Sequence, residues 1–352
     1  MNLAAYESLA KALDRLPGGF PPTASRVELQ VLKKIFSPEE ARLASCLSGT
    51  GETAGVIAAR AGLPVAETEA RLRAMRGRGI IWGSEREGTW SFRLAPFVVG
   101  VYESQWAVMD HEFSHLVEQY WNDGGMAGIM RYEPALHRVV PAQQAVKREV
   151  ILPYDDVKKL ILQARSFELR DCICRKQLDL VGKRQCEFPI RTCLNFSVKE
   201  RPAGPYDITQ QEALKVLDQA EEIGLVHTVS NVAAGVNYVC NCCGCCCAIL
   251  RGITQFGIAH SVAKANYYAV VEAEACNGCG ICEQRCQVRA CSVAGDVAVV
   301  DLTKCIGCGL CATGCPSEAV KLVLKPEAEI INPPADYRSW EQERLRNRGL
   351  VA

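Results

Sequence analysis

The sequence predicts an α+β protein that is divided into several domains. The chain has 352 residues, which is long enough for two or three domains. Helical and strand patterns of apolar residues alternate along it. Nineteen of its 20 cysteines lie after residue 170, in clusters. We expect an N-terminal domain at 1–100, a mostly helical cysteine-rich domain at 101–265, a compact cysteine-rich domain at 266–326 and a tail at 327–352.

The composition narrows the class of protein. Apolar residues make up 49% and charged residues 23%, as in globular proteins. The 40 basic and 40 acidic residues cancel, which disfavours DNA as a partner. We expect no transmembrane segment and no secretory signal, because long apolar runs are absent. Adjacent cysteines are poor disulfide partners, so reduced thiols in the cytoplasm are the expectation.

The N-terminal domain has the pattern of three short helices and a hairpin. Ser37 and Pro38 are typical of a helix start, and Gly62 is typical of a helix end. Residues 64–79 predict the third helix, and residues 80–96 alternate like a hairpin. This order resembles a winged helix-turn-helix. The third helix carries four arginines: Arg71, Arg73, Arg76 and Arg78. They suit a DNA-reading helix. In the alternative interpretation, they form the solvated face of a docking module.

Residues 266–326, here called the C-terminal cysteine region, contain the same cysteine spacing twice. Each copy reads C-x2-C-x2-C-x3-C, first in 276–286 and again in 305–315. A [4Fe–4S] cluster needs four thiolates, and in this spacing the fourth comes from the other copy. The spacing differs from that of zinc ribbons. We assign one cluster to Cys276, Cys279, Cys282 and Cys315, and the other to Cys305, Cys308, Cys311 and Cys286.

The two copies are about 29 residues apart, and strand patterns at 267–276, 296–305 and 319–325 flank them. The C-terminal cysteine region resembles bacterial two-cluster ferredoxins. In that family a proline usually follows the fourth cysteine, whereas this chain has Gln287. Cys291 is an extra thiol, which we expect to be a buried free cysteine.

A second set of thiols, here called the middle cysteine region, occupies residues 172–247. Its first four are Cys172, Cys174, Cys186 and Cys193, which could complete one [4Fe–4S] cluster. Zinc or free thiols are the alternative. Nearby cations would offset the negative charge of a thiolate-bound cluster or dock an acidic partner. These cations are Arg170, Arg175, Lys176, Lys183, Arg184 and Arg191.

The run CNCCGCCC supplies the other six thiols of the middle cysteine region. They are Cys240, Cys242, Cys243, Cys245, Cys246 and Cys247. Residues 248–257 predict a helix, and if it begins as early as Gly244, Cys243 and Cys247 share one face. Adjacent residues diverge by about 100° in a helix and about 180° in a strand, so one cluster should use only one of two neighbouring thiols.

Ten thiols exceed the eight that two clusters need. Three interpretations stay open: two further [4Fe–4S] clusters with two spare thiols, one further cluster beside reactive or structural thiols, or a non-cubane or enlarged cluster. The order of a winged-helix-like N-terminus, a CxCR segment, CNCCGCCC and a terminal two-cluster unit resembles multi-cluster ferredoxin-like proteins of anaerobic bacteria and archaea. That resemblance covers most of the chain and implies iron–sulfur electron transfer.

We therefore expect an electron-transfer protein with two to four [4Fe–4S] clusters. It would serve as a subunit or soluble partner of a larger anaerobic redox enzyme. One alternative is an oxidoreductase with a catalytic or unusual cluster at CNCCGCCC, fed by the C-terminal cysteine region. Another is a redox-sensing DNA-binding regulator. The sequence lacks a dinucleotide fingerprint, a P-loop and a CxxCH haem motif.

Overall fold

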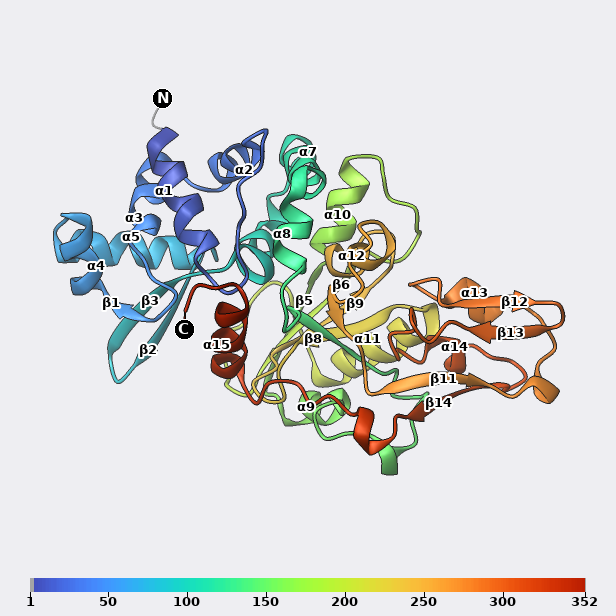
Figure 1. Cartoon of the computed structure of the whole chain (residues 1–352). Helices are drawn as coiled ribbons and strands as arrows, with labels where there is room; N and C mark the ends of the chain where they lie inside the picture. The colour runs from blue at the N-terminus through green and yellow to red at the C-terminus, as the bar shows by residue number, and fades with distance from the viewer. Residues whose placement is uncertain (1–2, 352) are drawn as a thin grey trace. The chain divides into compact units, whose positions relative to one another are not determined.

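The computed structural model describes residues 3–351 and divides the chain into two compact units (Figure 1). The first extends to Tyr132 and includes Gln177–Gly182 and the chain from Arg344 onward. The second contains Glu133–Lys176 and Lys183–Glu343. All cysteines of both cysteine regions lie in the second unit. The predicted boundaries at 100, 265 and 326 stay a prediction.

The first unit combines short helices with a three-stranded antiparallel sheet of order β1-β3-β2. Ser37 caps α3 in a reciprocal arrangement with Glu40, and Gly62 ends α4 in a left-handed conformation, as their positions in the sequence predict. The elements are α1 (Leu3–Asp14), α2 (Val27–Ile35), α3 (Pro38–Ser45), β1 (Glu52–Thr53), α4 (Ala54–Ala61), α5 (Val65–Gly77), β2 (Ile81–Arg86), β3 (Thr89–Leu94), α6 (Tyr102–Ser104), α7 (His111–Tyr120) and α8 (Met126–Met130).

The four arginines at the third predicted helix have partners inside the first unit. Arg71 pairs with Glu67 at 2.5 Å and Arg73 with Glu69 at 2.6 Å, along α5. Arg76 donates to the carbonyl of Gly83, and Arg78 pairs with Glu40. These contacts favour the interpretation of a solvated, internally paired face over that of a DNA-reading helix.

A seven-stranded sheet of order β10-β4-β8-β9-β6-β5-β7 forms the centre of the second unit. Its neighbours are antiparallel except β10 and β4. Helices α9 and α11 pack on it through an apolar core that includes Ile161, Leu217 and Val239. The elements are β4 (His137–Val140), α9 (Val157–Gln163), β5 (Ser166–Asp171), α10 (Ile173–Leu180), β6 (Arg191–Ser197), β7 (Asp207–Ile208), α11 (Gln210–Ile223), β8 (Val226–Ser230), β9 (Tyr238–Cys242), α12 (Ala248–Thr254) and β10 (Val262–Ala263).

This sheet shows that the prediction of a mostly helical middle domain is wrong. Residues 154–172 have helical spacing of apolar residues, yet the helix α9 ends at Gln163 and Ala164 is extended. Strand β5 then follows at once. Every residue of β4 is buried, so its sequence does not alternate. Short buried strands cannot be told from helical segments by periodicity alone, and the sheet forms through pairings between distant segments.

In the C-terminal cysteine region, β11 pairs with β14 and β12 with β13, both antiparallel (Figure 1). Three of these strands are the predicted ones. Gly278 and Gly280 have φ of 66° and 74°, and the residues 29 positions later, Gly307 and Gly309, have 72° and 76°. Both copies therefore use the same glycine-dependent loop before a short helix. The elements are β11 (Tyr267–Val271), α13 (Ile281–Arg285), β12 (Cys291–Ala294), β13 (Val297–Val300), α14 (Leu310–Thr313) and β14 (Val320–Leu324).

The tail contains the helix α15 (Tyr337–Asn347). Within the second unit, the Trp340 indole donates to the Ala135 carbonyl at 2.9 Å. Of the helices formed by residues 3–351, none has the length and apolar character needed to cross a membrane.

The stability of the second unit should fall as the pH drops through the range in which His137 would be protonated. This side chain is buried on β4, with its ring nitrogens 3.1 Å from the Thr228 hydroxyl and 2.9 Å from the Tyr238 hydroxyl. Burial lowers the pKa of His137 to about 4 from 6.5. Between these values the unfolded chain binds the extra proton, so stability rises with pH from about 4 to 6.5 and levels off above.

His137→Gln should flatten this part of the pH profile. We expect the pH-dependent contribution of the imidazole to be about 3 kcal/mol in full. Denaturant unfolding of both proteins between pH 5 and pH 7, under anaerobic conditions, measures it. Parallel profiles for the variant and the wild type would contradict the assignment of a buried neutral imidazole.

Candidate metal centre

The run CNCCGCCC is a strand followed by a tight turn. Cys242 ends β9, residues 243–246 make the turn, and Cys247 is the extended residue before α12. The helix predicted for residues 248–257 is therefore present as α12 and does not begin as early as Gly244. The extended conformation of Cys247 delays the helix, and the turn is held by the Thr254 hydroxyl, which donates to the Gly244 carbonyl at 2.7 Å.

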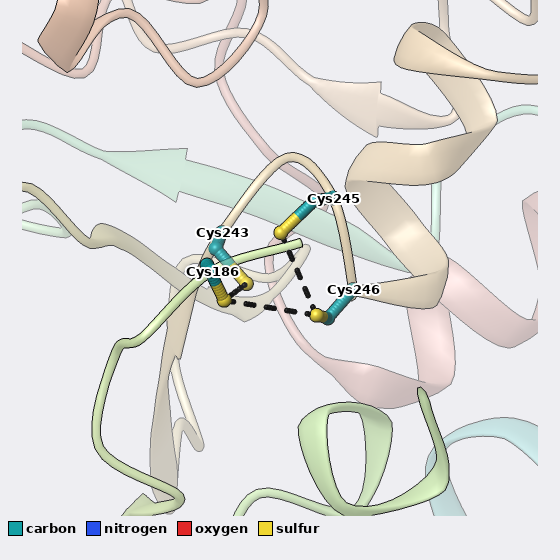
Figure 2. Close-up of side chains that lie close together, drawn as sticks. All are labelled: Cys186, Cys243, Cys245 and Cys246. Carbon is teal, nitrogen blue, oxygen red and sulfur yellow. Dashed lines mark hydrogen bonds between the residues drawn. The ribbon is translucent and has the colours of Figure 1, made fainter. Parts of the chain in front are cut away.

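Four sulfur atoms converge at this turn and form what we call the first sulfur group. The Sγ atoms of Cys186, Cys243, Cys245 and Cys246 all lie within 4.8 Å of one another, and they point toward a common centre in Figure 2. Cys186 Sγ is 3.8 Å from both Cys243 and Cys246, and Cys245 is 3.5 Å from Cys246. The neighbours Cys245 and Cys246 share this group because the turn, unlike a helix or strand, directs both inward.

A second sulfur group lies on the other side of the same run. Cys174, at the start of α10, interacts electrostatically with Cys172 and with Cys247. Cys247 in turn interacts electrostatically with Cys242. Cys242 and Cys247 are both buried. The adjacent pairs 242/243 and 246/247 are thus divided between the two groups, as the expected divergence of neighbouring side chains requires.

Two thiols of the middle cysteine region remain outside both groups. Cys193 on β6 and Cys240 on β9 hydrogen-bond with each other across neighbouring strands, whose register pairs Leu194 with Val239. Cys240 also hydrogen-bonds with Cys242. The structure therefore brings all ten predicted thiols into one neighbourhood, in which Cys240 contacts both Cys193 and the second sulfur group.

Arg175 is a buried cation beside both sulfur groups. It has no exposed surface, and its guanidinium donates to the Asn241 carbonyl at 2.7 Å and to the Thr192 hydroxyl at 2.5 Å. One Nη lies 3.9 Å from Cys243 Sγ. Although desolvation opposes it, negative charge on nearby thiols raises the pKa of Arg175; these thiols are Cys172, Cys243, Cys242 and Cys186, two from each group.

Interactions between neighbouring thiols shift the pKa values of the thiols in the middle cysteine region. The pKa of Cys242 is lowered to about 5 because Cys240 and Cys247 donate hydrogen bonds to it. Cys243 and Cys246 likewise lower the pKa of Cys245 to about 4. Neighbouring thiols thus favour the thiolate form of these two sulfurs. A bound metal would displace the remaining protons, and soft thiolate sets of this kind suit zinc or iron–sulfur clusters.

The C-terminal cysteine region brings together the two predicted sets of ligands. One pocket is lined by Cys276, Cys279, Cys282 and Cys315 together with the glycine loop 277–281. In the other set, Cys308 interacts electrostatically with Cys311, Cys286 and Cys305. The amide of Ala298 donates to Cys276 Sγ and that of Ala290 to Cys286 Sγ, at 3.4 and 3.0 Å. Convergent thiols with amide donors fit [4Fe–4S] clusters.

Cys291 contacts the second of these sets. It is buried and hydrogen-bonds with Cys286 and Cys311. Its burial agrees with the expectation for this extra thiol, and its position adds a fifth sulfur next to the four assigned ones.

Gln287 makes contacts with the middle cysteine region that the sequence did not predict. Its Oε1 accepts from the Gly244 amide at 2.9 Å, and its Nε2 donates to the Gly224 carbonyl at 3.0 Å. A Cβ on Gly244 would lie 1.9 Å from the Gln287 carbonyl oxygen. The replacement of the family's usual proline by a polar residue was the available signal. It joins the loop after Cys286 to the turn of the first sulfur group.

Arg285 strengthens the same junction from the other side of Cys286. Its guanidinium donates to the carbonyls of Glu221 and Glu222 at 2.7 and 2.8 Å, in the last turn of α11. A cation at a helix C-terminus is favoured by the helix dipole. The residues on both sides of Cys286 are therefore bound to the sheet-centred part of the second unit.

Comparison with protein families identifies one segment. The family model of the 4Fe-4S binding domain (Fer4) matches residues 298–321, which contain Cys305, Cys308, Cys311 and Cys315. Comparison with curated proteins and with solved structures gives no match. The match and the clustered cysteines make this chain an iron–sulfur protein with a role in electron transfer and at least one [4Fe–4S] cluster.

Proposed function

We propose that the protein conducts electrons between two [4Fe–4S] clusters in the C-terminal cysteine region and a further metal centre at the first sulfur group. Clusters of this type supply one-electron redox chemistry, whereas the chain supplies their spacing, insulation and potential. Each transfer moves a single electron and breaks no covalent bond. The observation that carries this proposal is the junction between Gln287 and Gly244.

That junction links ligands of two different sites through very few bonds. Cys286, a ligand of the second predicted cluster, is followed directly by Gln287. The Gly244 amide donates to the Gln287 side chain, and Gly244 is flanked by Cys243 and Cys245 of the first sulfur group. Arg285 holds the same loop in place. The close approach of the two backbones supports efficient transfer between the two sites.

The other end of the path supports contact with a redox partner. Cys279, in the predicted ligand set of the first cluster, is exposed, while Cys282 and Cys311 are buried. An electron would enter or leave through the exposed edge. We propose that the protein serves a larger oxidoreductase or exchanges electrons with a soluble partner in an anaerobic cytoplasm, where reduced thiols and oxygen-sensitive clusters persist.

Iron and sulfide analysis of the anaerobically purified protein tests the proposal. Because each cubane contributes four irons, we expect clearly more than about 8 irons per chain. The double variant Cys186→Ser/Cys243→Ser should lose about 4 of them and keep the C-terminal clusters. Cys46→Ser, a thiol of the first unit, is the matched control and should lose none. About 8 irons in wild type and variant alike would refute the proposal.

A further inference from the structure

We infer that the middle cysteine region holds two metal sites and that Arg175 is the cation shared by both. The first site is at the first sulfur group. The second is a [4Fe–4S] cluster on Cys172, Cys174, Cys242 and Cys247. This inference rests on the proposed function, since it assigns a second centre beside the one at the first sulfur group. It also leaves Cys193 and Cys240 without a metal.

The separation of the thiols into two groups carries the first part of the inference. Cys174 interacts electrostatically with Cys247, and Cys172 and Cys242 extend that set of neighbours on either side. The members come from three segments: the end of β5 with the start of α10, the end of β9, and the residue before α12. Ligands that converge from separate elements are held in place by the fold itself.

The first sulfur group cannot take these four thiols as well. Its own four sulfurs lie within 4.8 Å of one another. Cys242 and Cys243 are neighbours that point to different groups, and so are Cys246 and Cys247. A single enlarged cluster would need the sulfurs to surround one centre. The four sulfurs of the first sulfur group already surround one centre, whereas Cys242 and Cys247 interact with each other and Cys247 with Cys174.

The environment of Arg175 carries the second part. Burying an arginine without counter-charge is costly, so buried guanidinium groups are normally paired. In the described part of the chain, Arg175 forms no ion pair with a carboxylate. Its guanidinium instead lies 3.9 Å from Cys243 Sγ of the first sulfur group and donates to the carbonyl of Asn241, the residue before Cys242 of the second. Two thiolate-bound clusters would each carry net negative charge, and one cation between them lowers their mutual repulsion.

One atom of Arg175 also lacks a partner within the protein. Its buried Nε has no hydrogen-bond acceptor among the described residues. Buried donors are almost always satisfied, so an orphaned one points to a ligand. The inorganic sulfides of an iron–sulfur cluster accept hydrogen bonds from the protein. A donor of this kind fits a cluster seated against the guanidinium.

Metal analysis of three double-cysteine variants tests the inference. After anaerobic reconstitution with iron and sulfide, the wild type should contain about 16 irons, and Cys174→Ser/Cys247→Ser should contain about 12. Cys186→Ser/Cys243→Ser should also contain about 12, which shows that the two losses are independent. The matched control Cys193→Ser/Cys240→Ser should retain all of the iron.

Each of the other outcomes has a definite meaning. If the wild type and Cys174→Ser/Cys247→Ser both contain about 12 irons, the second site is absent. The proposed function would still stand, because one cluster beyond the two C-terminal clusters would be present. Loss of iron from the control would show that the division into groups is wrong. One zinc per chain, lost with Cys174→Ser/Cys247→Ser, would overturn the choice of an iron–sulfur cluster. Retention of the C-terminal cluster signals in electron paramagnetic resonance (EPR) spectra establishes that each variant is folded.

Discussion

Arg175→Gln is expected to lower the midpoint potentials of the clusters in the middle cysteine region and to weaken their retention. The substitution removes a positive charge that is buried next to thiols of both sulfur groups. It also leaves the Asn241 carbonyl and the Thr192 hydroxyl without their donor. Breaking a buried charged network costs about 3–5 kcal/mol, a large share of the stability of a domain.

Redox titration followed by EPR measures the shift. Loss of the cation favours the less negative oxidised state, and a stabilisation of about 1.4 kcal/mol corresponds to about 60 mV for one electron. We therefore expect a decrease of about 60 mV or more in the middle clusters and little change in the C-terminal clusters. Arg191→Gln is the matched control, because this exposed arginine belongs to the same basic set. Equal shifts in both variants would contradict a specific role for Arg175.

Gly244→Ala is expected to disrupt the junction between the two cysteine regions. The added Cβ would lie 1.9 Å from the carbonyl oxygen and 3.0 Å from the carbonyl carbon of Gln287. Both are backbone atoms, so no side-chain rotation relieves the clash, and one loop must move. Overpacking of this kind costs about 1–3 kcal/mol and here also breaks the hydrogen bond from the Gly244 amide.

The functional result should be slower electron transfer with an unchanged iron content. Rapid mixing with a reductant, followed by freeze-quench EPR, separates reduction of the C-terminal clusters from that of the middle ones. Gln287→Ala, which removes the side-chain contacts and leaves the backbones as they are, should give a smaller effect in the same direction. Gly77→Ala is the matched control, because a Cβ there meets nothing within 4 Å. Unaltered transfer in Gly244→Ala would exclude the junction as the path.

The C-terminal cysteine region could be predicted from the sequence because its information is local. Three ligands of each set fall within seven residues, and glycines such as Gly280 and Gly309 mark the loops. The cap at Ser37 and the end of α4 at Gly62 are local in the same sense. Such features depend on the conformation of a few consecutive residues.

The middle cysteine region could be predicted only in its composition. Its sheet pairs segments that are far apart in the chain, for example His137 with Ser230. The start of α12 depends on the turn of residues 243–246, which packs against Gln287. The sorting of adjacent thiols into two groups likewise depends on where Cys186 and Cys174 arrive from other elements. Periodicity contains no information on these long-range contacts.

The most direct test of electron transfer between the two cysteine regions is the EPR spectrum of the reduced protein at increasing microwave power. Reduced clusters that lie close enough for rapid transfer interact magnetically. We expect the signals of the C-terminal clusters to be broadened and to relax faster in the wild type than in a fourfold variant. This variant combines Cys186→Ser/Cys243→Ser and Cys174→Ser/Cys247→Ser in one chain. Identical spectra and power saturation in the two proteins would contradict the proposal.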